Sequence, residues 1–174
     1  MATVVRASLT DILPLIEARI VSVTGLDTSA VFSVCRSVPP NYIGDHVIQI
    51  RPGGFRVFQE IAVPGGRIDT RVERTLHVRV LTRLALDEPD RDSTWIKDKT
   101  LGHFVLEESV CDALQNFQPT DTDGNWLVDR PLHLANTDNA ETDEDEPGWG
   151  HSIIQVNLAY ILPLTQPPDP NFPL

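Results

Sequence analysis

The spacing of apolar and polar residues changes along the chain, and each change marks an expected element. Near the N-terminus apolar residues recur at steps of three and four, as on one face of a helix: Ile12, Leu15, Ile16, Ile20 and Val23. We predict a helix over residues 10–24, capped by Thr10 and ended by Gly25. A second helix is predicted from about residue 92 to Asn116, before Pro119.

Elsewhere apolar and polar residues alternate, which is the period of a half-buried strand. This alternation predicts strands over residues 31–38, 45–51, 70–84 and 149–164. The run Pro52-Gly53-Gly54 is expected to end the second strand. A connection as long as the one that follows normally has a task, and its Phe55 and Phe58 are expected to pack against something.

Together these elements predict an α+β fold: a mainly antiparallel sheet of four or more strands with two helices packed on one face. We expect one domain over residues 1–164. It includes residues 52–70 as a long β-arm or an ordered loop, and residues 120–150 as an acidic insertion with a short candidate strand at 126–128. Residues 165–174 are expected to form an extended, Pro-rich tail.

Composition narrows the classes of protein. With 174 residues, 41% of them hydrophobic, the chain is long enough to bury a core without metals or disulfides. Cys35 and Cys111 are too few for a disulfide framework and are expected to be free thiols in a reducing compartment. No apolar run approaches the roughly 18 residues of a membrane span. The N-terminus lacks a secretory pattern, so we expect a soluble protein made in the cytoplasm.

Charge is divided unevenly along the sequence. Residues 51–83 hold seven arginines against three acids, whereas residues 87–146 hold seventeen acids against four bases. Such a division suits copies that meet head to tail. The expected subunit or partner interface consists of Phe55, Phe58, Arg67, Arg71, Arg74, Arg79 and Arg83, with Asp143, Glu144, Asp145 and Glu146 as the acidic complement.

The arginines admit three uses at this point. They are ordinary charges on a wet strand face, partners of a neighbour's acids, or contacts to DNA phosphates in a pore. The acidic tract is equally consistent with a solubilising loop. The net charge of −11 argues against general affinity for nucleic acid.

Candidate metal ligands form no strong motif. Asp121, Asp123 and Asn125 resemble the start of a calcium loop, but the required glycine and glutamate are missing further on, so a turn with solvated acids is expected. His103 and Glu107 are four residues apart on the second helix, without the second histidine of a zinc helix. We interpret His103 as a surface histidine and expect no cofactor, no metal site and no catalytic residue.

The layout resembles the tail terminator, or tail completion, proteins of long-tailed bacteriophages. The resemblance rests on element order and size: the opening helix, the strand pair, the Pro/Gly-marked arm, the long strand 71–84, the helix 100–117 and the closing strand 152–164. It implies a structural virion protein, not an enzyme, that is assembled in the host cytoplasm. It also implies a hexameric ring that caps the tail tube and stops its growth. The implied partners are the tail tube protein and the head-side connector or neck proteins, with DNA passing through the lumen without specific binding.

Three other readings remain open. A head-completion or other neck protein of the same virion would share the ring. A metal-dependent enzyme or calcium-binding module would use Asp121, Asp123, Asp129, His103 and Glu107. A monomeric binding domain would present the basic strand face to an acidic partner.

Overall fold

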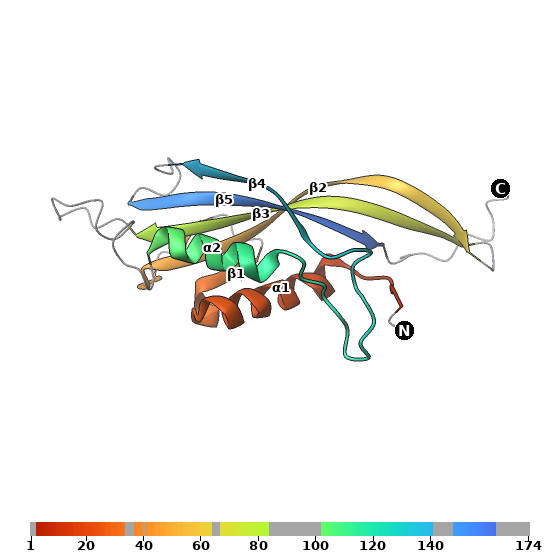
Figure 1. Ribbon diagram of the computed structural model, residues 1–174, viewed down its shortest axis with the longest axis horizontal. Coiled ribbons are helices and arrows are strands. Elements are labelled where there is room, and N and C mark those ends of the chain that lie inside the picture. The colour runs from red at the N-terminus through yellow and green to blue at the C-terminus, as the bar shows by residue number, and fades with distance from the viewer. Residues whose placement is uncertain are drawn as a thin grey trace.

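The computed structural model describes residues 3–33, 37–39, 41–63, 67–83, 102–140 and 148–162. Its elements, in chain order, are α1 (Leu9–Thr24), the short 3-10 helix η1 (Thr28–Ala30), β1 (Val31–Ser33), β2 (His46–Val63), β3 (Arg67–Arg83), α2 (His103–Leu114), β4 (His133–Ala140) and β5 (Trp149–Ile161). The five strands form one sheet in the order β1-β2-β3-β5-β4, in which only the β1–β2 pair is parallel. Both helices cover the same face of the sheet, so the predicted α+β class is confirmed (Figure 1).

The first helix begins two residues earlier than the sequence pattern indicated. Its cap is Ser8, whose backbone N–H and hydroxyl both donate to the carboxylate of Asp11 in a capping box. The predicted cap, Thr10, therefore lies inside the helix. The predicted end is confirmed, because Gly25 takes a left-handed conformation with φ of 71° and its N–H donates to the carbonyl of Val21.

The helix also buries a slightly different stripe from the one expected. Its buried residues are Ile12, Leu13, Ile16 and Ile20. Val23, which the pattern placed on the core side, is 38% exposed. The other helix, α2, is described only from Gly102 onward, so the predicted start near residue 92 lies outside the described residues.

Pro52-Gly53-Gly54 does not end a strand, contrary to our prediction. β2 continues through it to Val63, and the pairing with β3 shifts register between Pro52 and Phe55 and again between Val57 and Gln59. Among the described residues, β1 pairs with β2 only as far as Ile50, and an edge position of this kind tolerates Pro52. The two glycines lie in the bulge between Pro52 and Phe55, where they have no paired residue on β3. Residues 52–70 are therefore mostly strand, which confirms the β-arm and excludes the loop.

The main core lies between the helices and the sheet. Val72, Leu76, Val78 and Val80 of β3 are all 0% exposed on this side, as predicted. They pack with buried residues of α1, α2 and β5. The opposite face was predicted to be wet or interfacial, and this is only partly right. At one end it carries a second small core of Val47, Leu81 and Trp149, against which Phe32, Val38 and Tyr42 pack.

The predicted acidic insertion also belongs partly to the sheet. Its residues 133–140 form β4, the edge strand beside β5. The predicted strand at 126–128 is absent from the described segment 102–140, where Trp126 makes only isolated bridges with Val4 and Thr120. Just before β4, the N–H of Asp129 donates to the carbonyl of Ala159 at 2.7 Å. The closing strand, β5, confirms the prediction at its start and ends at Ile161.

Candidate interaction surface

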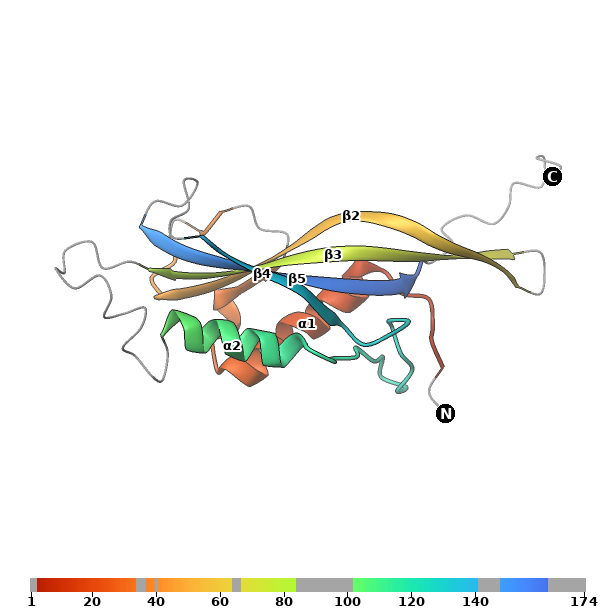
Figure 2. The same cartoon turned by 45° about the horizontal axis from the view of Figure 1, so that its top comes forward.

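One part of the sheet extends beyond the rest of the body. We call residues 55–63 of β2 and 67–74 of β3 the arm. β5 ends at Ile161, opposite Arg71, so the outer half of the arm is a two-stranded ribbon. Figures 1 and 2 both show the arm running past the end of β5 and past both helices. Beyond its root, the body reaches the arm through Arg6, which pairs with Asp69, and through Leu162, whose N–H donates to the carbonyl of Thr70.

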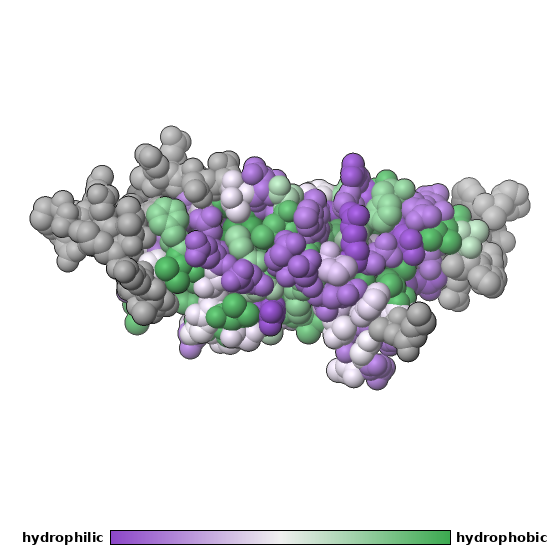
Figure 3. Space-filling view, viewed as in Figure 1, coloured by the Kyte–Doolittle hydropathy of each residue, from purple (hydrophilic) through white to green (hydrophobic). Residues whose placement is uncertain are grey.

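The arm exposes apolar side chains. Phe55 and Val57 are each 50% exposed, Ile68 is 48% exposed and Phe58 is 45% exposed. Cross-strand pairing puts Val57 opposite Val72, and Val72 points into the main core. Phe55 and Ile68 share this face by the alternation of the strands, whereas Phe58 sits at the second bulge. Figure 3 shows hydrophobic surface among hydrophilic residues along the arm. We call Phe55, Val57, Phe58 and Ile68 the apolar arm patch.

Arg74 accompanies this patch. Its guanidinium lies over the ring of Phe55, with 5.2 Å to the ring centroid, and Nη1 donates to the carbonyl of Gly53 at 2.7 Å. Among the described residues, no carboxylate pairs with Arg74. The structure therefore brings together two of the predicted interface residues, Phe55 and Arg74, and exposes a third, Phe58, further along the same strand.

The opposite face of the arm is an ion-pair network. Glu73 accepts hydrogen bonds from Arg56 and Arg130. The hydrogen bond from Arg56 lowers the pKa of Glu73, and the charges of Arg56 and Arg130 lower it further. Near the tip, Nε of Arg6 donates to Asp69 at 2.8 Å. Glu73 and Asp69 are thus both paired with cations of the same chain.

Arg71 also has an intramolecular partner. Its Nη2 lies 3.3 Å from Oδ1 of Asp129, and Nη1 donates to Gln59 at 3.1 Å. Asp129 belongs to the acid-rich half of the sequence. The charge division is thus partly neutralised inside one molecule, an arrangement that the sequence alone did not reveal.

Arg79 and Arg83 lie far from the arm, at the other end of β3. From Arg71 to Arg83 a strand spans roughly 40 Å at about 3.3 Å per residue. Arg79 is only 5% exposed, and its Nη1 donates to Gln49 at 3.2 Å. Arg83 is exposed and lies over the ring of Trp149 at 5.1 Å. The predicted arginines therefore do not form one continuous surface.

Two parts of the predicted interface lie outside the residues that the structure describes. Arg67 is the first residue of β3, but its side chain is outside the described residues. The acidic complement, residues 143–146, is also outside them. The pairing of that tract with the arginines stays a prediction.

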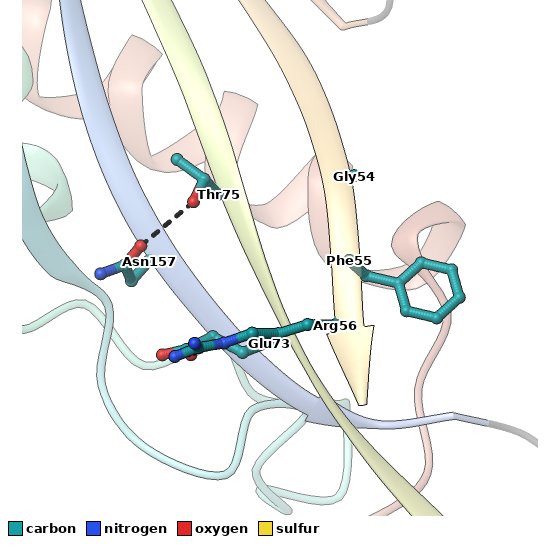
Figure 4. A pocket seen from close by; sticks show the side chains of 6 residues that line it. All are labelled: Gly54, Phe55, Arg56, Glu73, Thr75 and Asn157. Carbon is teal, nitrogen blue, oxygen red and sulfur yellow. Dashed lines mark hydrogen bonds and ion pairs between the residues drawn. The ribbon is translucent and has the colours of Figure 1, made fainter. Parts of the chain in front are cut away.

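A shallow hollow of about 420 Å³ lies on the sheet face away from the helices. It is lined by Gly54, Phe55, Arg56, Glu73, Thr75 and Asn157. Figure 4 shows Arg56 and Glu73 lying across β3, while the Phe55 ring points away beyond β2. Thr75 Oγ1 lies 3.3 Å from Asn157 Oδ1. Glu73 is the one carboxylate in the lining of this hollow, and it is paired with Arg56.

The candidate metal and calcium ligands from the sequence form other interactions in the structure. Asp121 Oδ1 accepts the N–H groups of Asp123 at 2.9 Å and Asn125 at 2.8 Å, and the Asn125 bond lowers the pKa of Asp121. This is the expected turn. Asp129 faces Arg71 instead of this turn. Within the described ranges, no group of three or more ligating side chains could hold a metal ion.

His103 is not the surface histidine that we predicted. It is 1% exposed at the start of α2, and its Nδ1 lies 2.9 Å from Thr82 Oγ1. Burial lowers the pKa of His103 to about 4, and the nearby His46 and His151 add to this. The sequence could not reveal the burial, because a lone histidine at a helix start carries no periodic signal.

No protein-family model and no curated protein sequence matches the chain. Among solved structures, a chain of the virion of a native gene transfer agent particle is 14% identical, with a TM-score of 0.43, over 82% of this chain and 83% of that one. A second solved chain is 11% identical, with a TM-score of 0.42, over 92% of this chain and 99% of that one. Likeness at this level carries no argument about function. In the part of the chain that the structure describes, no helix has the length and apolar character needed to cross a membrane.

Proposed function

We propose that the chain is a structural protein of a phage-like virion that works as a tail terminator. In this role copies form a ring, a hexamer by the resemblance, at the head-proximal end of the tail tube. The ring ends tube growth and joins the tail to the head-side connector. It performs no reaction, and assembly takes place in the host cytoplasm.

The observation that carries this proposal is the arm. Its four apolar residues are between 45% and 50% exposed on a ribbon that runs past the end of β5 and past both helices. Contiguous apolar surface of this kind marks a site of association. A projecting arm that binds a different surface of the next copy makes a heterologous contact, and such contacts form a ring when the rotation from copy to copy closes.

The order of elements supports the same role. An opening helix, a short strand, a long hairpin arm, a second helix and a long closing strand follow one another along the chain. This is the order on which the resemblance to tail terminator proteins rests. The net charge of −11 also suits a ring that lets DNA pass without gripping it.

The test is assembly on the tube. The purified full-length chain is examined by sedimentation velocity and negative-stain microscopy, alone and after mixing with the tail tube protein of the same particle. We expect rings and tubes of shorter, defined length with one capped end. Rings that cap the portal or connector instead would identify a neck protein. A chain that stays monomeric and leaves tube growth unchanged would overturn the proposal.

A further inference from the structure

The exposed face of α2 has the opposite character to the arm. Phe104, Glu108 and Asp112 are exposed and four residues apart, so they form one stripe along the helix. Phe104 is 42% exposed. Residues 103–114 contain no lysine or arginine. We call Phe104, Glu107, Glu108 and Asp112 the α2 acidic face.

No cation of the described residues neutralises this face. Glu107, Glu108 and Asp112 make no ion pair there, and one carboxylate oxygen of Glu107 is buried without a hydrogen-bond partner. Arg19 of α1 comes near, but its Nε donates to the carbonyl of Ala113 at 3.2 Å, at the end of the helix. Among the residues that the structure describes, the α2 acidic face thus carries negative charge without a cationic partner.

The pKa of the neighbouring Cys111 thiol is affected by the same negative charge. Cys111 lies among these acids, and its pKa is raised to about 11, first by burial and then by Glu107, Asp112 and Glu108. A raised thiol pKa is the expected response to nearby carboxylates. Together with the exposed Phe104, this gives an acidic surface with an aromatic residue at one end.

The arm offers the complement. Arg6, Arg56, Arg71 and Arg130 all hold carboxylates of their own chain. Arg74, beside the apolar arm patch, contacts a carbonyl and a ring instead. Glu60 lies further out on this face, opposite Thr70, so positive charge is concentrated at the root of the arm.

We propose that the arm of one copy packs onto the α2 acidic face of a second copy. The apolar arm patch covers Phe104, and Arg74 pairs with Glu108 and Asp112. The arm and α2 lie toward opposite ends of the molecule, so the contact joins two copies and not two parts of one (Figure 1). The dimensions agree, because the twelve-residue helix is about 18 Å long and residues 68–74 of β3, along which the patch and Arg74 lie, span roughly 20 Å.

This contact is heterologous, because each copy gives its arm to one neighbour and its helix to the other. This inference rests on the proposed function, because it assumes that copies of the chain form a ring. The inference also goes beyond the proposed function, because it names the arm and the α2 acidic face as the two surfaces that meet. The acidic tract at 143–146, which the sequence offered as the complement, has no part in it.

The test uses two variants that each destroy one surface. Phe58→Ser alters the arm, and Glu108→Arg with Asp112→Arg alters the helix. We expect each variant alone to sediment as a monomer, in solution and with the tail tube protein. An equimolar mixture should form dimers and nothing larger, because each variant keeps one intact surface. A mixture that stays monomeric, or single variants that form rings like the wild type, would overturn the inference.

A charge swap checks the pairing. Arg74→Glu should abolish ring formation, and adding Glu108→Arg and Asp112→Arg to it should restore at least half of the assembled fraction. Asp123→Arg, an equal charge change at an exposed turn, is the control and should assemble normally. Circular dichroism melting establishes that each variant is folded. If the wild type forms rings that the variants leave intact, only this inference fails; if the wild type never assembles, the proposed function fails with it.

Discussion

The guanidinium of Arg71 lies 3.3 Å from the carboxylate of Asp129, and this pair ties the arm to the segment that precedes β4. The two side chains are 28% and 20% exposed, so solvent screens their attraction only in part. Opposite charges that look in the sequence like complementary surfaces of two molecules are here joined within one. The free charges of the arm and of α2 are the ones left over after such internal pairing.

A double-mutant cycle measures this pair. Arg71→Ala, Asp129→Ala and the double variant are compared by urea unfolding. We expect a coupling free energy of about 0.5–1 kcal/mol, at the upper end for pairs near the surface. Strictly additive single effects would show that the pair contributes nothing to stability.

Gly53 and Gly54 provide a matched pair for the first bulge. A Cβ at Gly53 would lie 2.9 Å from the carbonyl oxygen of Thr75, whereas one at Gly54 would meet nothing within 4 Å. We therefore expect Gly53→Ala to lower the free energy of unfolding by roughly 1–3 kcal/mol, since the backbone of β3 must shift. Gly54→Ala should change it by less than about 0.5 kcal/mol. Chemical denaturation of both variants measures this, and equal effects would contradict the close approach.

Ser8 is the cap of α1. Replacing it with alanine removes the hydroxyl that bonds to Asp11, and we expect a loss of about 0.5–2 kcal/mol in the free energy of unfolding. Thr10→Ala is the control, because Thr10 occupies the second position of the helix and the backbone bonds of the cap do not need it. A larger loss for Thr10→Ala than for Ser8→Ala would be inconsistent with the capping box.

His103 should make stability depend on acid. Its folded pKa, about 4, is below the ordinary value of 6.5, so between these values the unfolded chain binds more protons than the folded one. The contribution of neutral His103 is therefore fully present above pH 6.5 and is lost as pH falls toward 4. Unfolding free energies from pH 7 to 4 should fall less steeply for His103→Gln than for the wild type. His133→Gln, at an exposed position, should leave the slope unchanged.

Regular periods in the sequence predicted most of the sheet and the first helix. β5 alternates cleanly because one of its faces is buried along its whole length, and β3 does so where Leu76, Val78 and Val80 enter the core; Ile12, Ile16 and Ile20 repeat because α1 packs on that face. The continuity of β2 was missed, because Pro52 and its glycines indicate a turn locally. Only the absence of a neighbouring strand at that point allows a strand to continue through them.

The candidate surface was predicted in part. Phe55 and Arg74 do lie together, since the register of the hairpin pairs them, and the exposed Phe58 follows on the same strand. The internal pairing of Arg71 and the burial of Arg79 depend on segments distant in the sequence, Asp129 and Gln49, which no local pattern connects. The sequence analysis counted the acids of residues 87–146 together and did not separate those on α2, so it did not identify the acidic stripe on this helix.

The two bulges in β2 also restrict how this protein can associate. From Arg51 outward, an unprotected strand edge of this length would offer its backbone groups to any passing strand and invite uncontrolled stacking. The interruptions at Pro52–Phe55 and Val57–Gln59 break the regular spacing that such stacking requires. Copies are therefore directed to meet through side chains, which can specify a closed assembly of fixed size instead of an open fibre.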